Sequence, residues 1–504
     1  MLAAAWTGTE TFWRLVEAAA RDRPNAVVFA DDHGRSLTTT GFRDEAERAA
    51  AGLRASGVAA GDVVSWQLPT TLEAAVLMAA CARLGAIQNP IIPVFRHREV
   101  GFIVRQVRAR LVIVPETWRG FGHGDMARSF GADVWALQFE RPPGPAMRLP
   151  AGDPAGLPPP PAASDGCRWI YYTSGTTADP KGAKHSDASV LASANGVLGG
   201  RGLGAGDVYP IGWPLAHIGG VSMVSSVLRT GGRLVFFDSF DPLTTPDRMA
   251  SHRPTILGSA TPFFNAYVAA QARAGVRPLF PALRACVGGG AETPETVNRQ
   301  VAEVLGVPGV VGAWGLTEFP VATSEAPADP EVGTSVGRPS PGVEVRVVGG
   351  ELRLRGPQCF LGYLDASLDV EAFDDQGWFR TGDLGTVDDD GRIQVTGRLK
   401  DVIVRNAENI SALEVEEVLR RHPGVADVAV IGVPDQPTGE RVCAVVVPGR
   451  GYELTLAELA AHCRAAGLAG YKCPERLQIV AELPRTPMGK VLKRQLLCED
   501  LPRL

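Results

Sequence analysis

A loop of small hydroxyl residues and glycine, placed between an apolar run and a helical pattern, constrains the fold of this chain most strongly. The run CRWIYY at 167–172 is typical of a strand, and a helical pattern begins after Ser186, with Ser186 or Asp187 as its cap. The sequence therefore predicts a strand, a loop and a helix in that order. Hydroxyls and backbone N–H groups that surround a glycine bind anions, and a lysine adds positive charge. The residues of this predicted phosphate-binding loop are Thr173, Ser174, Gly175, Thr176, Thr177 and Lys181.

This loop is not that of a common P-loop ATPase. That motif requires Gly-Lys followed by Ser or Thr, and the pair Gly489-Lys490 is followed by Val491. Taken alone, the loop could also be a Ser/Thr/Gly surface turn. However, YTSGTTADPKG closely resembles the phosphate-binding loop of the adenylate-forming superfamily, which includes acyl-CoA synthetases, luciferases and the adenylation domains of peptide synthetases. This chain has Ala178 where the usual loop has glycine.

The chain is long enough for more than one hydrophobic core. Its 504 residues imply at least two domains, and 45% hydrophobic with 21% charged residues is typical of a soluble globular protein. A net charge of -5 argues against a nucleic-acid partner. The eight cysteines are scattered without a CxxC pair, which favours neither a zinc site nor a disulfide framework. Without a basic leader or a run of about 20 apolar residues, we expect a cytoplasmic protein with no transmembrane segment.

Strand-like runs alternate with helical runs from residue 62 to residue 115 and again after the loop, which predicts βαβ crossovers and a parallel sheet. Near residue 342 the pattern changes to strand, Gly349-Gly350 turn, strand, which predicts an antiparallel hairpin. Past residue 398, short strands and helices predict a separate small domain, in which Ser411 and Glu414 form a capping box. The expected fold class is α/β. Residues 1–398 form a large domain of mostly parallel sheets and helices, and residues 399–504 form a small α+β domain.

Two glycine-containing segments follow the loop in the order found in the superfamily: GGGAE at 288–292 and AWGLTE at 313–318. Taken alone, the first could be a tight turn and Trp314 a core residue. They resemble the superfamily's adenine-binding segments, which implies that Trp314 stacks on the purine and Thr317 reaches the α-phosphate. The resemblance also implies that Glu318 holds Mg²⁺ together with Thr176, and carboxylate oxygens suit that ion. The nucleotide contacts implied here are Gly289, Gly290, Ala291, Glu292, Trp314, Gly315 and Thr317.

A single histidine, His217 in WPLAHIGG, precedes a pair of glycines. A lone histidine is more often a structural residue than a ligand-binding one. In the superfamily this segment lines the acid-substrate pocket, so the resemblance implies that role here. The segments of the implied pocket carry little charge, and the His217 segment has no aspartate to bind an amino group, so we expect an apolar acid that is aliphatic, alicyclic or aromatic. The implied pocket residues are His217, Ile218, Gly219, Gly288 and Gly289.

Three motifs nearer the C-terminal end extend the resemblance. GWFRTGDLG at 377–385 resembles the ribose-binding motif, which implies that Asp383 accepts hydrogen bonds from the sugar; alone, it would be a glycine-rich turn. In GRLKD, Arg398 matches a nucleotide-contacting arginine, and Lys400 stands at the usual hinge of a mobile C-terminal domain. LPRTPMGKVLKRQL at 483–496 resembles the terminal motif whose lysine, here Lys490, contacts the nucleotide and neutralises charge as a carboxylate attacks the α-phosphate. The catalytic residues implied by the resemblance are Lys490, Thr176, Lys181, Glu318 and His217.

The loop RNAENI at 405–410 resembles the RGGENI of acyl-CoA ligases, with Asn406 and Ala407 in place of two glycines. Asparagine tolerates a positive φ much better than alanine does. In the family this loop borders the path of the attacking thiol, so these two departures affect the prediction of which thiol accepts the acyl group.

The resemblance, which runs from residue 172 to residue 496, implies an acid-CoA ligase. ATP with Mg²⁺ converts a carboxylic acid to acyl-AMP and pyrophosphate, and coenzyme A then displaces AMP. One alternative is transfer to the phosphopantetheine of a carrier protein, and another is a luciferase-like oxidation of the adenylate. A third is a nucleotide-binding regulatory protein with an eroded site. The residues that favour the third are Ala178, Asn406 and Ala407, and those that oppose it are Lys181, Glu318, Asp383 and Lys490.

Overall fold

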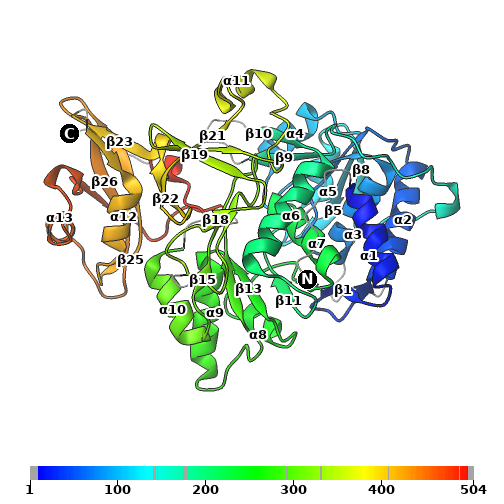
Figure 1. Cartoon of the computed structure of the whole chain (residues 1–504), viewed down its shortest axis with the longest axis horizontal. Helices are drawn as coiled ribbons and strands as arrows, with labels where there is room; N and C mark the ends of the chain where they lie inside the picture. The colour runs from blue at the N-terminus through cyan, green and yellow to red at the C-terminus, as the bar shows by residue number, and fades with distance from the viewer. Residues whose placement is uncertain are drawn as a thin grey trace.

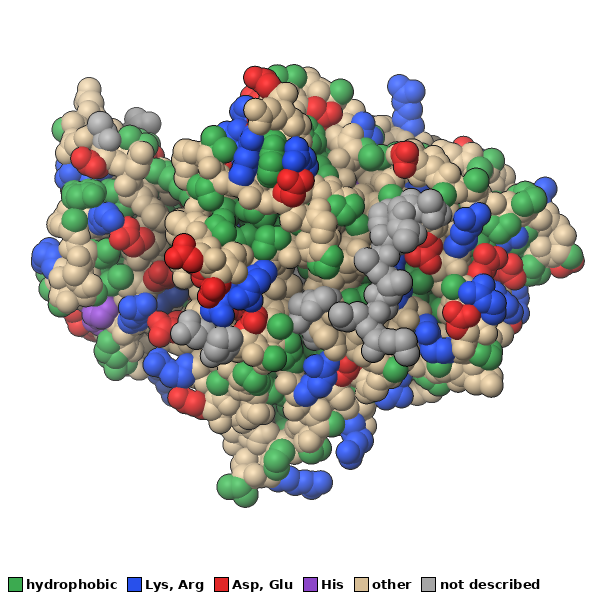
Figure 2. All heavy atoms as spheres, viewed as in Figure 1, with side chains coloured by type: hydrophobic (Ala, Val, Ile, Leu, Met, Phe, Trp, Pro, Cys, Tyr) green, Lys and Arg blue, Asp and Glu red, His purple; other side chains and the backbone are tan. Residues whose placement is uncertain are grey.

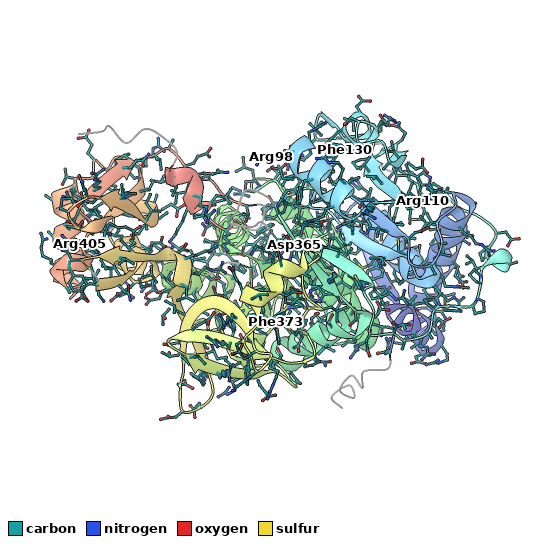
Figure 3. The ribbon with its side chains drawn as sticks, turned by 90° about the horizontal axis from the view of Figure 1, so that it is seen from above. Arg98, Arg110, Phe130, Asp365, Phe373 and Arg405 are labelled. Carbon is teal, nitrogen blue, oxygen red and sulfur yellow. The ribbon has the colours of Figure 1, made fainter. Side chains whose placement is uncertain are left out.

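The computed structural model describes residues 10–139, 144, 146–173, 180–290, 293–329, 332–406, 408–486 and 489–497. The elements follow one long axis, from the N-terminal sheets at one end to the C-terminal strands at the other (Figure 1). Arg110 and Arg405 lie toward these two ends in Figure 3. Within the described ranges, no helix is long and apolar enough to cross a membrane.

A six-stranded sheet in the order β10-β9-β4-β3-β5-β8 carries the predicted phosphate-binding loop between β9 and β10. Every neighbouring pair is parallel except β9 with β10, as the alternation of strands and helices predicted. Its strands are β3 (Val63–Trp66), β4 (Ile87–Pro90), β5 (Leu111–Pro115), β8 (Asp133–Leu137), β9 (Trp169–Thr173) and β10 (Lys181–His185). Helices α3 (Leu72–Leu84), α4 (His97–Gln106) and α5 (His123–Arg128) connect them, and β6 (Thr117–Trp118) pairs with β7 (Phe121–Gly122).

Helix α3, which connects β3 to β4, is buried along its whole length. Every residue of the helix is buried, as its nearly continuous apolar sequence leads one to expect. The Thr71 hydroxyl accepts from Ala74 N at the start, and Gly85 ends the helix with a φ of 79°.

A second sheet, in the order β11-β12-β1-β2, joins the beginning of the chain to residues far along it. β12 lies parallel to β1 and to β11, whereas β2 is antiparallel to β1. Its strands are β1 (Val27–Asp31), β2 (Ser36–Thr38), β11 (Val208–Ile211) and β12 (Arg233–Phe236). The helices of this region are α1 (Phe12–Asp22), α2 (Thr39–Ala55), α6 (Asp187–Arg201) and α7 (Ile218–Thr230).

The middle of the chain forms three smaller sheets. The first is parallel, and consists of β13 (Ile256–Ser259), β14 (Ala285–Gly288) and β15 (Val310–Val311), with α8 (Thr245–Ala250), α9 (Thr261–Ala274) and α10 (Glu295–Leu305). The second is antiparallel, with β16 (Ala313–Trp314), β17 (Thr323–Ser324) and β18 (Arg338–Pro339). The third is also antiparallel, with β19 (Glu344–Val348), β20 (Glu351–Arg355), β21 (Phe379–Val387) and β22 (Ile393–Arg398), and α11 (Asp369–Ala372) lies beside it. The predicted hairpin at Gly349-Gly350 is confirmed, because β19 pairs with β20 and both glycines have positive φ.

The C-terminal part is a mixed sheet with two helices. Its elements are β23 (Val402–Arg405), β24 (Glu408–Ser411), α12 (Ala412–Arg420), β25 (Val425–Asp435), β26 (Gly439–Pro448), α13 (Leu456–Ala465) and β27 (Arg476–Ile479). Its main hydrophobic cluster, from Ile403 to Cys473, draws on no residue of the N-terminal sheets. The prediction of an α/β fold with a large N-terminal and a small C-terminal domain is thus confirmed. The boundary at residues 398 and 399 stays a prediction.

Two local predictions need correction. The loop is followed by a strand before the helix, because β10 pairs antiparallel with β9 and only then does Ser186 cap α6. The segment KGAKH lacks β-branched and aromatic residues, so its sequence did not indicate a strand. At α12, the Ser411 hydroxyl caps the helix as predicted, but the Glu414 carboxylate binds Lys472 at 2.8 Å, so the capping box is incomplete.

Candidate active site

The strands that flank the predicted phosphate-binding loop bring its two ends together. Thr173 at the end of β9 pairs with Lys181 at the start of β10. Several predicted site residues and departures lie outside the described residues: Ser174, Gly175, Thr176, Thr177, Ala178, Ala291, Glu292 and Ala407.

Strand β10 is bound on its other side by the segment 361–364. Lys184 N donates to Gly362 O at 3.0 Å, and Leu361 N donates to Lys184 O at 2.7 Å. This pairing brings Tyr363 to the start of β10, where the Lys181 ammonium lies 5.4 Å from the centre of the tyrosine ring. A cation over an aromatic face is stabilised by the ring quadrupole. Sequence reasoning missed Tyr363, because nothing in GPQCFLGYLD indicates that it lies near the loop.

A buried histidine holds the backbone of the predicted α-phosphate contact. His185 Nε2 lies 2.8 Å from the Thr317 carbonyl oxygen and Nδ1 lies 2.9 Å from the Ser189 hydroxyl. Burial lowers the pKa of His185 to about 4, so the ring is neutral near pH 7. Because a carbonyl oxygen only accepts, Nε2 carries the proton and donates it. His185 was also missed, since a histidine between Lys184 and Ser186 has no distinctive pattern.

The predicted magnesium ligand is held by the same tyrosine. Glu318 is 8% exposed, and the Tyr363 hydroxyl donates to its Oε1 at 2.6 Å. Burial and the neighbouring Glu318 charge raise the pKa of Tyr363 far above its usual value, so the hydroxyl stays a donor.

Trp314, Asp383 and Arg398, predicted from three separate motifs, lie in contact. The Trp314 indole Nε1 donates to Asp383 Oδ2 at 2.8 Å, and Arg398 Nε lies 2.8 Å from Oδ1. Asp383 is 1% exposed and lies within strand β21, paired with Arg398 on β22, rather than in the turn that its glycines suggested. The structure therefore gathers the predicted adenine, ribose and arginine positions around one buried carboxylate.

Lys490 is brought to this group by the C-terminal loop. A Cβ on Gly489 would lie 3.0 Å from Pro262 Cδ, so the loop packs on the start of α9. Burial, together with the positive charges of Arg398 and Lys400, lowers the pKa of Lys490 to about 8. The pKa of Lys400 is lowered by burial and by Arg398. A cluster of cations thus surrounds Asp383, a charge distribution suited to an anionic ligand.

His217 has a structural role that the sequence left open. It is the N-cap of α7, and its Nδ1 accepts from Gly219 N at 3.2 Å. Burial lowers its pKa to about 4, so the ring is neutral. It also lines a small, mainly apolar hollow that extends to Thr317. Other residues of this hollow are Pro90, Ile91, Ile92, Phe95, Ile103, Tyr171, Tyr172, Ala216 and Ile218.

Four further positions singled out from the sequence have a clear local structure. Gly289 N donates to Ser259 O at 3.0 Å, which ties the end of β14 to β13. Gly290 has a φ of 82°, and Gly315 has no room for a side chain because a Cβ would lie 2.5 Å from Val321 N. Asn406 has a φ of 49°, so the departure from glycine retains a left-handed backbone that asparagine tolerates.

On the face seen in Figure 2, acidic and basic side chains are interspersed. That face therefore carries mixed charge.

The chain matches known protein families over most of its length. The AMP-binding enzyme family model matches residues 16–364, and the model of the AMP-binding enzyme C-terminal domain matches residues 414–490. The medium-chain fatty-acid–CoA ligase of Escherichia coli is 30% identical over 97% of this chain and 90% of its own length. A salicyl-AMP ligase / salicyl-S-ArCP synthetase of Mycobacterium tuberculosis is 33% identical over 97% of this chain and 90% of its own.

The fold also matches that of a solved structure. ATP-bound MatB from Rhodopseudomonas palustris superposes with a TM-score of 0.84 at 28% identity, over 96% of this chain and 98% of that one. The match covers both the N-terminal sheets and the C-terminal part. Together with the two family models, it shows that this chain belongs to the family of AMP-binding enzymes, the adenylate-forming superfamily.

Proposed function

We propose that the protein is an ATP-dependent acid-CoA ligase. In the first step a carboxylate oxygen of the acid attacks the α-phosphorus of ATP and pyrophosphate leaves, which gives acyl-AMP. In the second step the thiolate of coenzyme A attacks the acyl carbon, and AMP leaves with the electrons of the broken C–O bond. The observation that carries this proposal is the contact of Trp314, Asp383 and Arg398 with Lys490 beside them.

Each described residue takes a role that its surroundings support. Trp314 offers an aromatic face to adenine, and Asp383 offers a buried carboxylate to the ribose hydroxyls. Arg398 and Lys490 supply positive charge where the acid and the α-phosphate, both anions, meet. Lys181 supplies charge at the end of the phosphate-binding loop.

The site also fits a magnesium ion. Mg²⁺ is commonly held by one or two carboxylates together with substrate phosphates. Glu318 provides one such carboxylate, buried and already oriented by Tyr363. Thr176 of the loop is its proposed partner. When bound, the ion would offset the negative charge of the phosphates.

The acid itself is proposed to be apolar. The hollow beside His217 is lined by aliphatic and aromatic side chains, and none of the described residues that line it carries a carboxylate or ammonium group. His217 is neutral there, so it offers hydrogen bonding rather than charge.

A pyrophosphate-release assay over a panel of carboxylic acids, with and without coenzyme A, tests the function. We expect release that depends on ATP, Mg²⁺ and an apolar acid, and an acyl-CoA product when coenzyme A is present. An acid that yields acyl-AMP but no acyl-CoA would contradict the proposed acceptor. No acid-dependent release from any member of the panel would contradict adenylation itself.

Transfer to a carrier protein is the second candidate, because one relative is a salicyl-S-ArCP synthetase. The loop around Asn406 offers a test between the two acceptors. Because Asn406 keeps the positive φ that glycine would supply, glycine substitutions there should leave the backbone of Asn406 unchanged. If coenzyme A is the acceptor, changing Asn406 and Ala407 to glycine changes acyl-CoA formation only modestly. A large gain of acyl-CoA formation in that variant would favour the carrier protein.

The pKa of Lys490 gives a pH prediction. Its protonated form is the one that neutralises charge, and in the free enzyme that form is lost as the pH rises through about 8. We therefore expect kcat/KM for adenylation to fall on the alkaline side with an apparent pKa near 8. In Lys490→Arg this alkaline decrease in kcat/KM should move to much higher pH, because arginine stays charged. If the decrease stayed near the same pH in that variant, a group other than Lys490 would be responsible for it.

A further inference from the structure

We propose that Tyr363 is a positioning residue for Glu318, one that fixes the carboxylate that binds Mg²⁺ during adenylation; this inference rests on the proposed function. The hydroxyl donates to Glu318 Oε1 at 2.6 Å, and both side chains are buried, with 6% and 8% exposed. A carboxylate that is hydrogen-bonded at one oxygen has less rotational freedom, which lowers the entropy lost on binding an ion.

Tyr363 is itself held on three sides. Its backbone N donates to Asp369 Oδ1 at 2.8 Å, and its ring packs edge-on against Phe360 with centroids 4.9 Å apart. Its backbone also forms a bridge to Ala183 in β10. The hydroxyl therefore has a position set by the fold rather than by a flexible side chain.

The same support serves the phosphate-binding loop and the metal carboxylate. Strand β10 begins at Lys181, whose ammonium lies over the Tyr363 ring, and it ends at His185, which holds the Thr317 carbonyl. Glu318 follows Thr317, and its own carbonyl accepts from Phe360 N at 2.9 Å. A phosphate group bound beside Lys181 and an ion bound to Glu318 would thus be held in register by one short strand and the segment paired with it.

The variant Tyr363→Phe isolates the hydroxyl. It keeps the ring, and so keeps the packing on Phe360 and the cation–π contact with Lys181. A matched control is Tyr267→Phe, because Tyr267 is also buried, at 0% exposure, and its hydroxyl donates to Gly258 O at 2.7 Å. Both variants lose one buried hydroxyl, but only the first loses a contact to Glu318.

Calorimetric titration with ATP, in EDTA and in MgCl₂, is the first measurement. We expect Tyr363→Phe to bind metal-free ATP within about twofold of the unmodified protein and to lose most of the tightening that Mg²⁺ gives. The Mg²⁺ concentration for half-maximal pyrophosphate release should rise about tenfold, the usual scale for removing an outer partner of a metal ligand. Thioester formation from supplied acyl-AMP should not change. Tyr267→Phe should show no shift in its magnesium requirement.

Glu318→Gln separates failure of this inference from failure of the proposed function. A raised magnesium requirement in Glu318→Gln but not in Tyr363→Phe would overturn the role of Tyr363 and leave the metal site in place. No change in either would remove the ion from Glu318, and the inference would fall with it. Equal shifts in Tyr363→Phe and Tyr267→Phe would indicate general loosening and would also overturn it.

Discussion

Lys490→Ala is expected to lower the rate of acid-dependent pyrophosphate exchange by about 10²-fold or more, the scale of losing one preorganised charge donor. Adenylation brings a carboxylate toward a phosphate, and Lys490 is the residue proposed to offset that negative charge. Thioester formation from supplied acyl-AMP should be affected much less, because that step does not join two anions. The affinity for ATP should also change little, since the charge acts mainly in the transition state.

Lys493→Ala is a matched control for this prediction. Lys493 lies on the same terminal segment, but its ammonium binds Glu416 at 2.8 Å within the C-terminal part. We expect this variant to retain adenylation. Equal losses in both half-reactions of Lys490→Ala, measured by pyrophosphate exchange and by thioester formation, would reject the proposed division of labour.

Asp383→Ala is expected to weaken ATP binding by about tenfold or more, since hydrogen bonds to a charged group contribute about 1.5–3 kcal/mol each. The variant removes the proposed ribose acceptor, and it also leaves the Trp314 indole and Arg398 without the partner that holds them. Trp314→Ala should weaken binding by a smaller factor through lost stacking. Calorimetric titration with ATP measures both effects.

Asp374→Ala controls for the loss of a buried carboxylate beside the same sheet. The Asp374 side chain is 7% exposed and binds Arg353 at 2.8 Å, in contact with β20 rather than with the site. It should reduce thermal stability without changing the affinity for ATP. Unchanged nucleotide affinity in both Asp383→Ala and Trp314→Ala would remove the proposed site from this position.

Periodic patterns predicted the fold well because they depend on local sequence. The alternation from residue 62 to residue 115 predicted β3, β4 and β5 with their helices, and the glycine pair predicted the β19–β20 hairpin. Strand β10 was not predicted, because its pairing with β9 decides its conformation and its own residues do not. Tertiary pairing overrides weak local preference in such short strands.

The candidate site, like the fold, could be predicted from the sequence only in part. Its individual positions could be named from motifs, and Trp314, Asp383 and Arg398 do lie together. The contacts that orient them could not be named, because Trp314 and Asp383 are 69 residues apart and Tyr363 and Glu318 are 45 apart. A motif indicates which chemical group is present, whereas the partner of that group depends on how distant segments pack. His217 is the clearest example. Neither its hydrogen bond from Gly219 N nor its place in the lining of the hollow could be predicted from the sequence.

The sheet that contains β1 has a consequence for synthesis of the chain. β1 ends at Asp31, but its parallel partner β12 is complete only at Phe236, so about 200 residues must be translated between them. At roughly 5–20 residues per second, that interval is about 10–40 s. During this time β1 has no parallel partner. The C-terminal core, from Ile403 to Cys473, has no such delay, because its elements follow one another closely. During synthesis, the beginning of this chain therefore stays open to misfolding and to chaperone binding for longer than the C-terminal core does.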